Sequence, residues 1–245
     1  MKVIFLNIIF ILFISACGVS QADKPSFSLS AKEIFTDTAV LNLALAAGKG
    51  NIKDVKQYIQ SGINPNWMGK YKLTPLFWAL REHNIAGFKA LLKNGANPNI
   101  IIRSGSSVMH LVSRLKNSEY LRLCIQYGGD VDLMDTKTNE TPLFMAVSPD
   151  GKQNIAILLE EGANIDHLDK TRSSAIFRAA SLNQYDAVHN LLVKGANYNI
   201  KNVWNNTFIF YIENNRINKS SELYQWRKKV INFLIAKGVE INLKK

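Results

Sequence analysis

Apolar residues recur in pairs along most of this chain, and each pair stands three residues before a glycine. The pairs are Tyr58-Ile59, Leu91-Leu92, Cys124-Ile125, Leu158-Leu159, Leu191-Leu192 and Leu234-Ile235, and the glycines are Gly62, Gly95, Gly128, Gly162, Gly195 and Gly238. A second set of positions, mostly Thr or Ser, lies 21 residues before the first five glycines and 31 before the last: Leu41, Thr74, Ser107, Thr141, Ser174 and Thr207. The steps between these start positions are 33 or 34 residues. The pattern indicates six copies of one structural unit.

Each copy predicts two short helices followed by a loop. Thr or Ser at the start position suits a helix N-cap, because its hydroxyl can accept an otherwise unpaired backbone N–H. Pro75 and Pro142 follow directly, at the first helical position, where a missing N–H costs nothing. The glycines suit left-handed residues that end the second helix, a conformation that glycine adopts without a Cβ penalty. One unit cannot bury its own apolar face, so we expect the units to stack on their neighbours.

The residues Thr-Pro-Leu-Phe at 74–77 and 141–144, on a 33-residue period, resemble the T-P-L-H-x-A pattern of the ankyrin repeat. The resemblance covers residues 36–245. It implies an all-α fold, an ankyrin-repeat solenoid of about six helix-turn-helix units with short β-hairpin or loop fingers. The pattern's His is His110 in one repeat and Ala44 in the first, while the other four repeats have Phe77, Phe144, Phe177 and Phe210. In those four we expect ring packing to replace the hydrogen bonds of the His.

Three segments depart from the common pattern. The loop from Asp132 to Glu140 has one extra residue, which predicts an altered finger. Residues 148–151, Ser-Pro-Asp-Gly, predict a tight turn. The sixth repeat has a ten-residue insertion within 214–227, where Ser221 could cap a long C-terminal helix running to about Lys237. We expect this helix, with its basic cluster at 227–229, to be a C-terminal lid, and a dedicated contact site is the alternative.

The first residues of the chain predict export. Met1-Lys2, an apolar run at 3–13 and the small residues that follow are typical of a secretory signal peptide, residues 1–16. Ile14-Ser15-Ala16-Cys17 resembles the bacterial lipobox, which implies cleavage before Cys17 and lipidation of its thiol. The alternative is an ordinary signal peptide, and the run is short of the ~18 residues that a transmembrane helix needs. Because Gly18 rather than Asp follows the cysteine, the resemblance implies an outer-membrane lipoprotein facing the periplasm, with the inner membrane as the alternative.

A short polar segment joins this predicted anchor to the repeats. Residues 17–30 carry the lipidated Cys and a flexible tether, and the ankyrin-repeat domain occupies 31–245. Ser30 and Glu33 have the spacing of a capping box and predict a short helix. We expect this helix to shield the first repeat, whose start position is Leu41 rather than Thr.

Charge and chemistry narrow the possible partners. Residues 17–245 carry 29 Lys and Arg against 19 Asp and Glu, a net charge of +10, because Lys2 is the only charged residue before them. A basic protein can bind nucleic acid, an anionic membrane surface or an acidic protein, and export argues against nucleic acid. We find no catalytic or nucleotide-binding motif, and we predict no enzyme activity, no cofactor and no metal. Cys124 falls at an apolar core position, which predicts a buried thiol, and a reactive thiol is the alternative.

In the ankyrin family, partners usually bind the concave surface made by the finger tips and the first helices. The resemblance implies the same surface here, and the outward positions follow by counting from each start position. We predict partner contacts at Lys70, Tyr71, Trp78, Arg81, Arg103, Arg114, Lys137, Lys170, Arg178, Trp204 and Tyr211. Trp, Tyr and Arg are the usual energetic anchors of protein interfaces. For Trp78 and Tyr211 the alternative is packing between repeats.

The chain also resembles ankyrin lipoproteins encoded beside type VI secretion effectors, where such proteins act as immunity proteins. The stretches that carry this likeness are residues 107–111, 119–123, 183–186 and 224–231. It implies a stoichiometric inhibitor, monomeric when free, of an incoming toxin such as a phospholipase. One alternative is an envelope scaffold or assembly partner of a periplasmic enzyme of oxidative-stress defence. The other is direct binding to anionic lipid or peptidoglycan.

Overall fold

The computed structural model describes residues 29–243, which form two compact units. Unit 1 takes its described residues from Met1–Gly95 and Ile102–Ser104, and unit 2 from Ala96–Ile101 and Gly105–Lys245. Every regular element in residues 29–243 is helical. None of these helices has the length and apolar character needed to cross a bilayer. The predicted signal peptide, the lipidation at Cys17 and nearly all of the tether lie outside the described residues.

Unit 1 contains two helix pairs and a short leading helix. The elements are α1 Ala31–Ile34, α2 Thr38–Lys49, α3 Ile52–Gln60, the 3₁₀ helix η1 Lys70–Lys72, α4 Pro75–Arg81 and α5 Ile85–Lys93. The predicted capping box of α1 is confirmed: the Glu33 N–H donates to the Ser30 hydroxyl, and the Ser30 N–H donates to the Glu33 carboxylate. Ala31, Ile34 and Phe35 are buried with the first repeat, so α1 shields that repeat as predicted.

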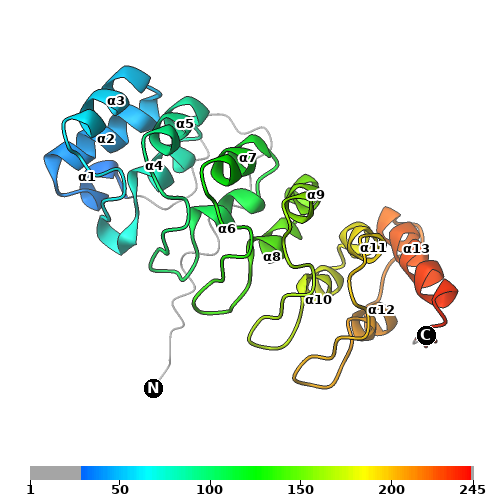
Figure 1. Ribbon diagram of the computed structural model, residues 1–245. Helices are drawn as coiled ribbons and strands as arrows, with labels where there is room; N and C mark the ends of the chain where they lie inside the picture. Colours follow the sequence, from blue (N-terminus) through cyan, green and yellow to red (C-terminus); the bar gives the residue numbers. More distant parts are fainter. Residues whose placement is uncertain (1–28, 244–245) are drawn as a thin grey trace. The chain divides into compact units, whose positions relative to one another are not determined.

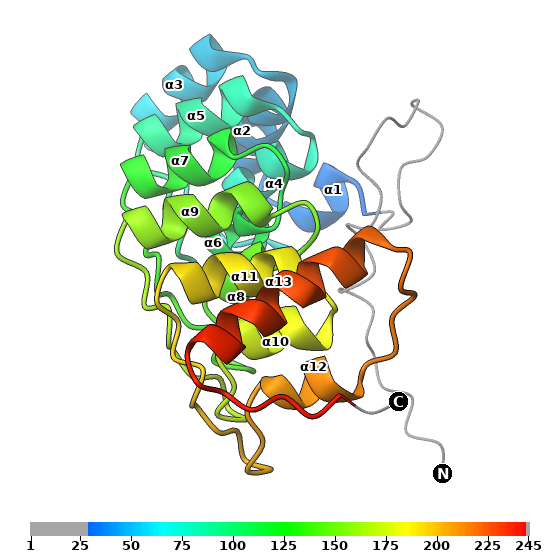
Figure 2. The ribbon, with the colours of Figure 1, turned by 90° about the vertical axis from the view of Figure 1, so that its right-hand side faces the viewer.

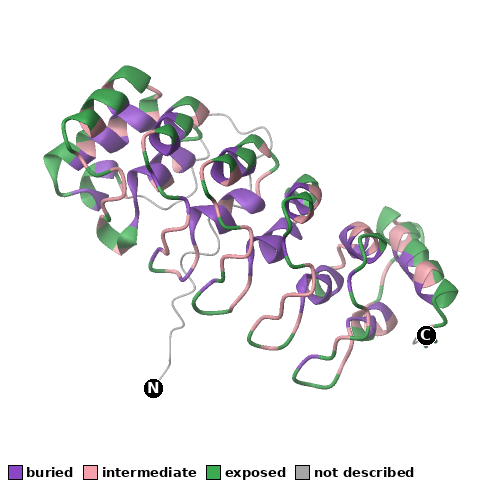
Figure 3. Ribbon diagram, viewed as in Figure 1, coloured by how far each residue is buried: buried purple, intermediate pink, exposed green. Residues whose placement is uncertain are grey.

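Unit 2 contains four helix pairs. They are α6 Val108–Ser113 with α7 Glu119–Gln126, α8 Pro142–Ala146 with α9 Lys152–Glu160, α10 Ala175–Ser181 with α11 Tyr185–Val193, and α12 Ile209–Asn214 with α13 Glu222–Ala236. Within this unit the first helices of the pairs form one row and the second helices form another (Figure 1). Burial follows the same division, because the buried residues lie where the rows meet and the loop tips are exposed (Figure 3). The helix-turn-helix repeats predicted from the sequence are confirmed.

The predicted N-caps are confirmed at four of the six start positions. Thr74 and Ser107 use their hydroxyls, Thr74 toward the Phe77 N–H at 3.3 Å and Ser107 toward His110. Thr141 and Ser174 occupy the cap positions, but their buried hydroxyls have no partner, because the N–H three residues later donates to the backbone carbonyl of the cap residue instead.

One predicted cap, Thr207, was wrong, and the first repeat, which has no Thr or Ser at its start position, has its cap elsewhere. There Asp37 is the N-cap of α2, four residues before Leu41. The Asp37 carboxylate accepts the N–H groups of Ala39 and Val40, so the helix gains a strong cap that the Thr pattern does not show. In the last repeat the cap is Phe208 rather than Thr207, because α12 begins one residue late.

The six glycines end the second helices in the left-handed conformation, as predicted. Their φ angles run from +80° to +96°. At Gly162 the next N–H, of Ala163, reaches back to the Leu158 carbonyl at 2.9 Å, which closes the helix end. A Cβ added at Gly162 would meet no atom within 4 Å. Glycine is therefore required there for its backbone conformation and not for close packing.

Side chains of the loops form hydrogen bonds from one repeat to the next. The side chain of Asn66 donates to the Gly95 carbonyl, and that of Asn99 donates to the Gly128 carbonyl, each at 2.8 Å. In the later repeats of unit 2, Asp132 accepts the Asn164 N–H and Asp166 accepts the Asn197 N–H, both at 2.9 Å. The polar residue four positions after each of the first four glycines thus fixes the start of the next loop.

The remaining departures appear where they were predicted. The Gly151 N–H donates to the Ser148 carbonyl at 3.1 Å, so residues 148–151 form the expected tight turn. Ser221 caps α13 by accepting the Tyr224 N–H, and the helix ends at Ala236 with Lys237 as its C-cap. Cys124 is fully buried, and burial raises the pKa of its thiol, so the predicted buried thiol is confirmed.

Replacing Gly162 tests the conformational argument. Gly162→Ala should lower the free energy of unfolding by about 1–2 kcal/mol, the usual cost of a left-handed Cβ residue. Gly162→Asn should cost less, because Asn tolerates this conformation. Urea denaturation of the three proteins measures both values. Equal losses for Ala and Asn would show that space, and not backbone conformation, limits the site.

Candidate protein-binding surface

Three finger loops stand on one side of unit 2, at residues 134–140, 169–173 and 202–206. One Asp or Asn side chain fixes each loop from inside. Asp135 accepts the N–H groups of Lys137 and Thr138 at 2.7 and 3.0 Å. In the same way Asp169 accepts those of Thr171 and Ser173, and Asn202 accepts those of Trp204 and Asn206. The carboxylates of Asp135 and Asp169 are therefore engaged within their own loops.

The fingers are loops bonded to one another, and no strand forms in the described residues. Each finger donates one backbone N–H to the finger before it: Thr136 to the Gly105 carbonyl, Lys170 to Thr138 and Val203 to Thr171, at 2.9 to 3.0 Å. The finger with the extra residue is altered as predicted, because its donor stands five residues before its start position instead of four. The fingers of unit 2 thus form a continuous ladder.

Basic side chains occupy the finger tips. Lys137, Lys170 and Arg172 are exposed, and the Lys170 ammonium lies 3.1 Å from the Thr136 carbonyl. Because Asp135 and Asp169 face their own backbone and Glu140 faces Arg178, the charges that a partner would meet first are positive. We call the three fingers, together with the partly exposed Arg114, Arg178 and Tyr211 beside them, the finger face.

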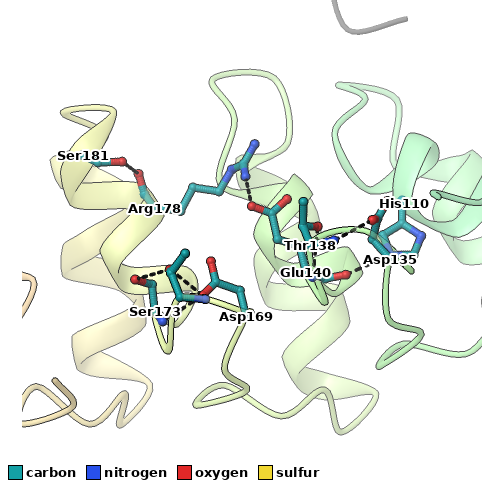
Figure 4. Close-up of polar contacts among 9 residues, drawn as sticks. His110, Asp135, Thr138, Glu140, Asp169, Ser173, Arg178 and Ser181 are labelled. Carbon is teal, nitrogen blue, oxygen red and sulfur yellow. Dashed lines mark hydrogen bonds and ion pairs between the residues drawn. The ribbon is translucent and has the colours of Figure 1, made fainter. Parts of the chain in front are cut away.

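An ion pair crosses the finger face between two repeats. Arg178 on α10 donates to the carboxylate of Glu140, at the base of the preceding finger (Figure 4). Burial raises the pKa of Glu140, and the charge of Arg178 opposes this shift. Burial lowers the pKa of Arg114, and the positive charge of Arg178 lowers it further. These two guanidinium groups therefore lie close enough to repel each other. The structure brings together Arg114, Glu140 and Arg178, which come from three repeats.

His110 lies behind this pair and is structural, as the ankyrin pattern implied. Its Nδ1 accepts the Ser107 N–H at 3.2 Å, and its Nε2 lies 3.1 Å from the Glu140 carbonyl (Figure 4). Those contacts require the neutral ring with its proton on Nε2. Burial lowers the pKa of His110, which favours the same neutral form.

The last finger carries an exposed aromatic side chain on a fixed backbone. The Trp204 N–H donates to Asn202 at 3.0 Å, while the Trp204 side chain is 65% exposed. Tyr211 on α12 is half-buried and meets Phe210 edge-on, with ring centroids 5.7 Å apart. A large ring held rigidly in solvent loses little conformational entropy on binding, which suits an interface anchor.

The predicted contacts in unit 1 divide into two groups. Lys70 and Arg103 are exposed, and each places its charge 5.4 Å from the ring of Tyr71. Trp78 is only 6% exposed and packs edge-on against Phe35. It leaves little surface for a partner, in line with the alternative of packing.

Arg81 has a structural role in the same cluster of unit 1. Its guanidinium stacks 4.7 Å from the Trp78 ring and donates to the Leu29 carbonyl at 2.6 Å. Burial lowers the pKa of Arg81. The side chain thus ties the segment before α1 to α4.

Sequence reasoning misplaced two residues of the last repeat. Phe210 is 42% exposed, although its counterparts Phe144 and Phe177 are buried, and Phe208 is buried instead. Arg227 is also buried, where it donates to the Ile212 carbonyl, so the expected basic cluster at 227–229 keeps only Lys228 and Lys229 on the surface. The first difference accompanies the late start of α12, and the second follows from the bond of Arg227 on α13 to the Ile212 carbonyl of α12.

Two further residues have roles that the repeat pattern does not show. Arg172 adds an exposed positive charge at the tip of its finger, on a left-handed backbone with φ +58°. Asn154 on α9 is fully buried, and its amide donates to the carbonyls of Val112, Ser113 and Leu115 at 3.3, 2.9 and 2.8 Å. It closes the C-terminal end of α6 from the neighbouring repeat. A lone Asn before an apolar run gives no sequence signal for this role.

α13 packs onto α11 and borders a hollow of about 370 Å³ between the second helices of unit 2. Its Trp226 and Phe233 rings meet His189 at 5.8 and 6.3 Å. Within residues 29–243, no three His, Cys, Asp or Glu side chains are grouped so that they could hold a metal ion.

A family model described as ankyrin repeats, three copies, matches residues 43–135 and 108–202. Solved structures agree in fold. The ankyrin repeat domain of Bcl-3 has a TM-score of 0.69 at 23% identity, covering 83% of this chain and 89% of that chain. The ankyrin repeat protein EF0377 has a TM-score of 0.67 at 22% identity, covering 80% and 97%.

Three curated proteins show the range of relatives. The putative palmitoyltransferase ZDHHC13 of Danio rerio is 30% identical over 60% of this chain, the B-cell lymphoma 3 protein homolog of Mus musculus 23% over 66%, and Protein PhlB of Serratia liquefaciens 28% over 59%. The matches span 23%, 37% and 63% of those proteins' own lengths. The similarity therefore concerns the repeats and not the whole relatives.

Removing the Asn154 amide should destabilise unit 2. Asn154→Leu leaves three carbonyl groups at the end of α6 without their donor, and we expect a loss of about 1–3 kcal/mol in the free energy of unfolding. Gln153→Leu, an exposed neighbour on the same helix, is the control and should change stability by less than about 0.5 kcal/mol. Urea denaturation followed by circular dichroism measures both. Similar values for the two variants would contradict the clamp.

His110 predicts a pH dependence of stability. An unfolded His titrates near pH 6.5, and the folded pKa is lower, so the unfolded state binds more protons as the pH falls through this range. The wild type should therefore lose stability between pH 7 and 5. His110→Phe should lower stability at pH 7.5 by about 1–3 kcal/mol, because the Ser107 N–H loses its acceptor. It should also lose less between pH 7 and 5, and an unchanged pH dependence would count against this role.

Proposed function

This chain belongs to the ankyrin-repeat family, and on that premise we propose that it binds another protein through the finger face. Ankyrin repeats indicate a protein-binding role. The observation that carries the proposal is the combination of a rigid backbone and uncommitted tips. Side-chain bonds from Asp135, Asp169 and Asn202 hold the loops, while the side chains of Lys137 and Trp204 are exposed at the tips and Lys170 is exposed beside the neighbouring finger.

The basic tips favour an acidic partner. Complementary charge steers association and disfavours wrong partners, and the chain as a whole carries +11. Trp204 would supply the apolar anchor, with Arg114 and Arg178 held at the base of the fingers. Arg178 is already oriented by Glu140, so binding would cost little additional ordering of that side chain.

We propose further that the protein is a periplasmic lipoprotein and a stoichiometric immunity protein against a type VI secretion effector, such as a phospholipase. The support is in the sequence: a predicted signal peptide at 1–16, lipidation at Cys17, and the likeness of four stretches to effector-associated ankyrin lipoproteins. Anchoring to the outer membrane would keep the inhibitor where the toxin arrives. An inhibitor of this kind needs only a surface that covers the toxin's active site, and the finger face is the surface we propose for it.

The test is a pull-down from the strain's own secreted and periplasmic proteins, with residues 18–245 as bait. The variant carries Lys137→Glu, Lys170→Glu and Trp204→Ala on the finger face. A matched control carries Lys53→Glu, Lys56→Glu and Ile52→Ala on the exposed side of α3. We expect wild type and control to capture one secreted hydrolase in equal molar amount, and the finger variant to lose at least about tenfold in affinity.

The other possible outcomes distinguish the proposed immunity function from its alternatives. Capture of resident envelope enzymes would favour the scaffold function over immunity. Capture that the finger variant leaves unchanged would remove the finger face from the proposal. If the folded bait captures nothing, stoichiometric protein binding is contradicted, and anionic vesicles and peptidoglycan become the next ligands to test.

A further inference from the structure

The second helices of unit 2 border a hollow of about 370 Å³ that the finger face does not include. α11 lies between α9 and α13, and α13 crosses it obliquely (Figure 2). One stripe of α11 forms the floor: Asp186, His189, Asn190 and Val193 stand at positions i, i+3, i+4 and i+7, which share one side of a helix. Pockets that bind drug-sized ligands measure about 300–1,000 Å³, so this hollow has room for one side chain and the peptide group beside it.

The apolar part of the lining is mainly aliphatic. Ile155 of α9 and Ala187 of α11 line the hollow, and Val193, at the C-terminal end of the stripe, is 58% exposed. Trp226 of α13 supplies the one aromatic wall. An apolar side chain placed there would cover Val193 and lose its own contact with water, which favours binding.

The charges around the hollow are matched in sign. Lys152 of α9 forms an ion pair with Asp186. On α13, the Lys229 ammonium lies 3.9 Å from the centroid of the Trp226 ring, and the Glu222 carboxylate accepts the indole N–H at 3.4 Å. One face of the indole is therefore covered by a cation, and each positive group has a negative counterpart nearby. Such a balance selects neither an acidic nor a basic ligand, and an uncharged one fits it best.

Two polar side chains of the floor are left for a ligand. Within residues 29–243, neither the His189 ring nor the side-chain amide of Asn190 makes a hydrogen bond, and both side chains are half-buried. The rings of Trp226 and Phe233 hold the His189 ring between them, at 5.8 and 6.3 Å. An Asn side chain offers both N–H donors and a carbonyl acceptor, so it can pair with both polar groups of a peptide bond.

We infer that this hollow, which we call the α11 hollow, binds an uncharged segment of a protein partner. An aliphatic side chain of the segment packs against Ile155, Val193 and Trp226, and the peptide group beside it pairs with Asn190. The inference rests on the proposed protein-binding function, because that function makes the occupant a protein segment. It adds a second contact, on the row of second helices, to the one proposed at the finger face.

The probe for the test is N-acetyl-leucinamide, which carries one aliphatic side chain between two amide groups and no charge. Titrated into the isotope-labelled full chain and followed by NMR, it should shift the Trp226 indole N–H and the backbone N–H signals of Ala187, His189 and Asn190. We expect a Kd in the millimolar range, as for other small fragments.

Variants test the assigned contacts. Asn190→Leu should weaken binding of the probe at least about threefold, because it removes the hydrogen bonds and keeps the apolar volume. Val193→Asp should also weaken it, because it places a charge in the apolar contact. Gln57→Leu, which removes an exposed amide from the second helix α3 of unit 1, is the matched control and should leave the affinity unchanged. The same spectra show that each variant is folded.

The remaining outcomes separate this inference from the function beneath it. If N-acetyl-leucine, which bears a carboxylate, or N-acetylglucosamine binds more tightly than the amide, the uncharged peptide is refuted as the occupant. If the amide shifts none of these signals, or Asn190→Leu and Val193→Asp bind it like wild type, the α11 hollow is overturned, and a partner captured through the finger face still supports the proposed function. Binding of the amide in the hollow, together with a pull-down that captures nothing, supports the hollow and contradicts the finger face.

Discussion

The fold depends on contact between neighbours, because no helix of the regular repeats is long enough to be stable alone. In unit 2 the helices from α6 to α12 have five to nine residues, well below the length at which isolated helices persist in water. Their stability comes from burying side chains such as Met109, Phe144 and Leu158 against adjacent repeats. The hydrogen bonds between repeats fix how each repeat is aligned with the next. Asn154 shows how directly one repeat completes another, since it supplies the end of a helix that is not its own.

Two kinds of polar residue share the finger face, and they do different work. Asp135, Asp169 and Asn202 turn inward and satisfy backbone N–H groups. Lys137, Lys170 and Arg172 are exposed at the finger tips, and the Lys170 ammonium donates to the Thr136 carbonyl of the preceding finger. A count of Lys and Asp in the sequence would rate the fingers as nearly neutral, but the geometry sorts the two signs to different depths. The effective surface is therefore more basic than its composition.

Much of the fold could be predicted from the sequence, because the repeat pattern depends on interactions between residues that are close together in the chain. Gly162, Pro142 and the Ser30–Glu33 box each act within a few residues of themselves, and the structure has them as expected. The same reasoning did not predict Asp37, because it caps α2 from a position outside the Thr pattern of the repeats. Local signals thus define the repeats, and local exceptions shift their ends by a few residues.

The candidate site was harder to predict because its contacts join residues that are distant in sequence. Counting by phase put Arg178 on the outward side, yet only the stacked repeats show that it pairs with Glu140. Trp78 has the phase of a surface residue and is buried because Phe35, more than forty residues earlier, covers it. Phe210 has the phase of a core residue and is exposed, whereas Phe208, two residues earlier, is buried. Periodicity predicts which way a side chain points, but not what stands in front of it.

The inward-turned residues of the fingers have an evolutionary consequence. Since Asp135, Asp169 and Asn202 set the backbone of each loop, the tip side chains can be exchanged without disturbing the scaffold that displays them. A mutation at Lys137 or Trp204 then changes partner binding and has little effect on the stability of the fold. A lineage carrying such a protein could follow a changing target by single substitutions, each viable from the moment it arises.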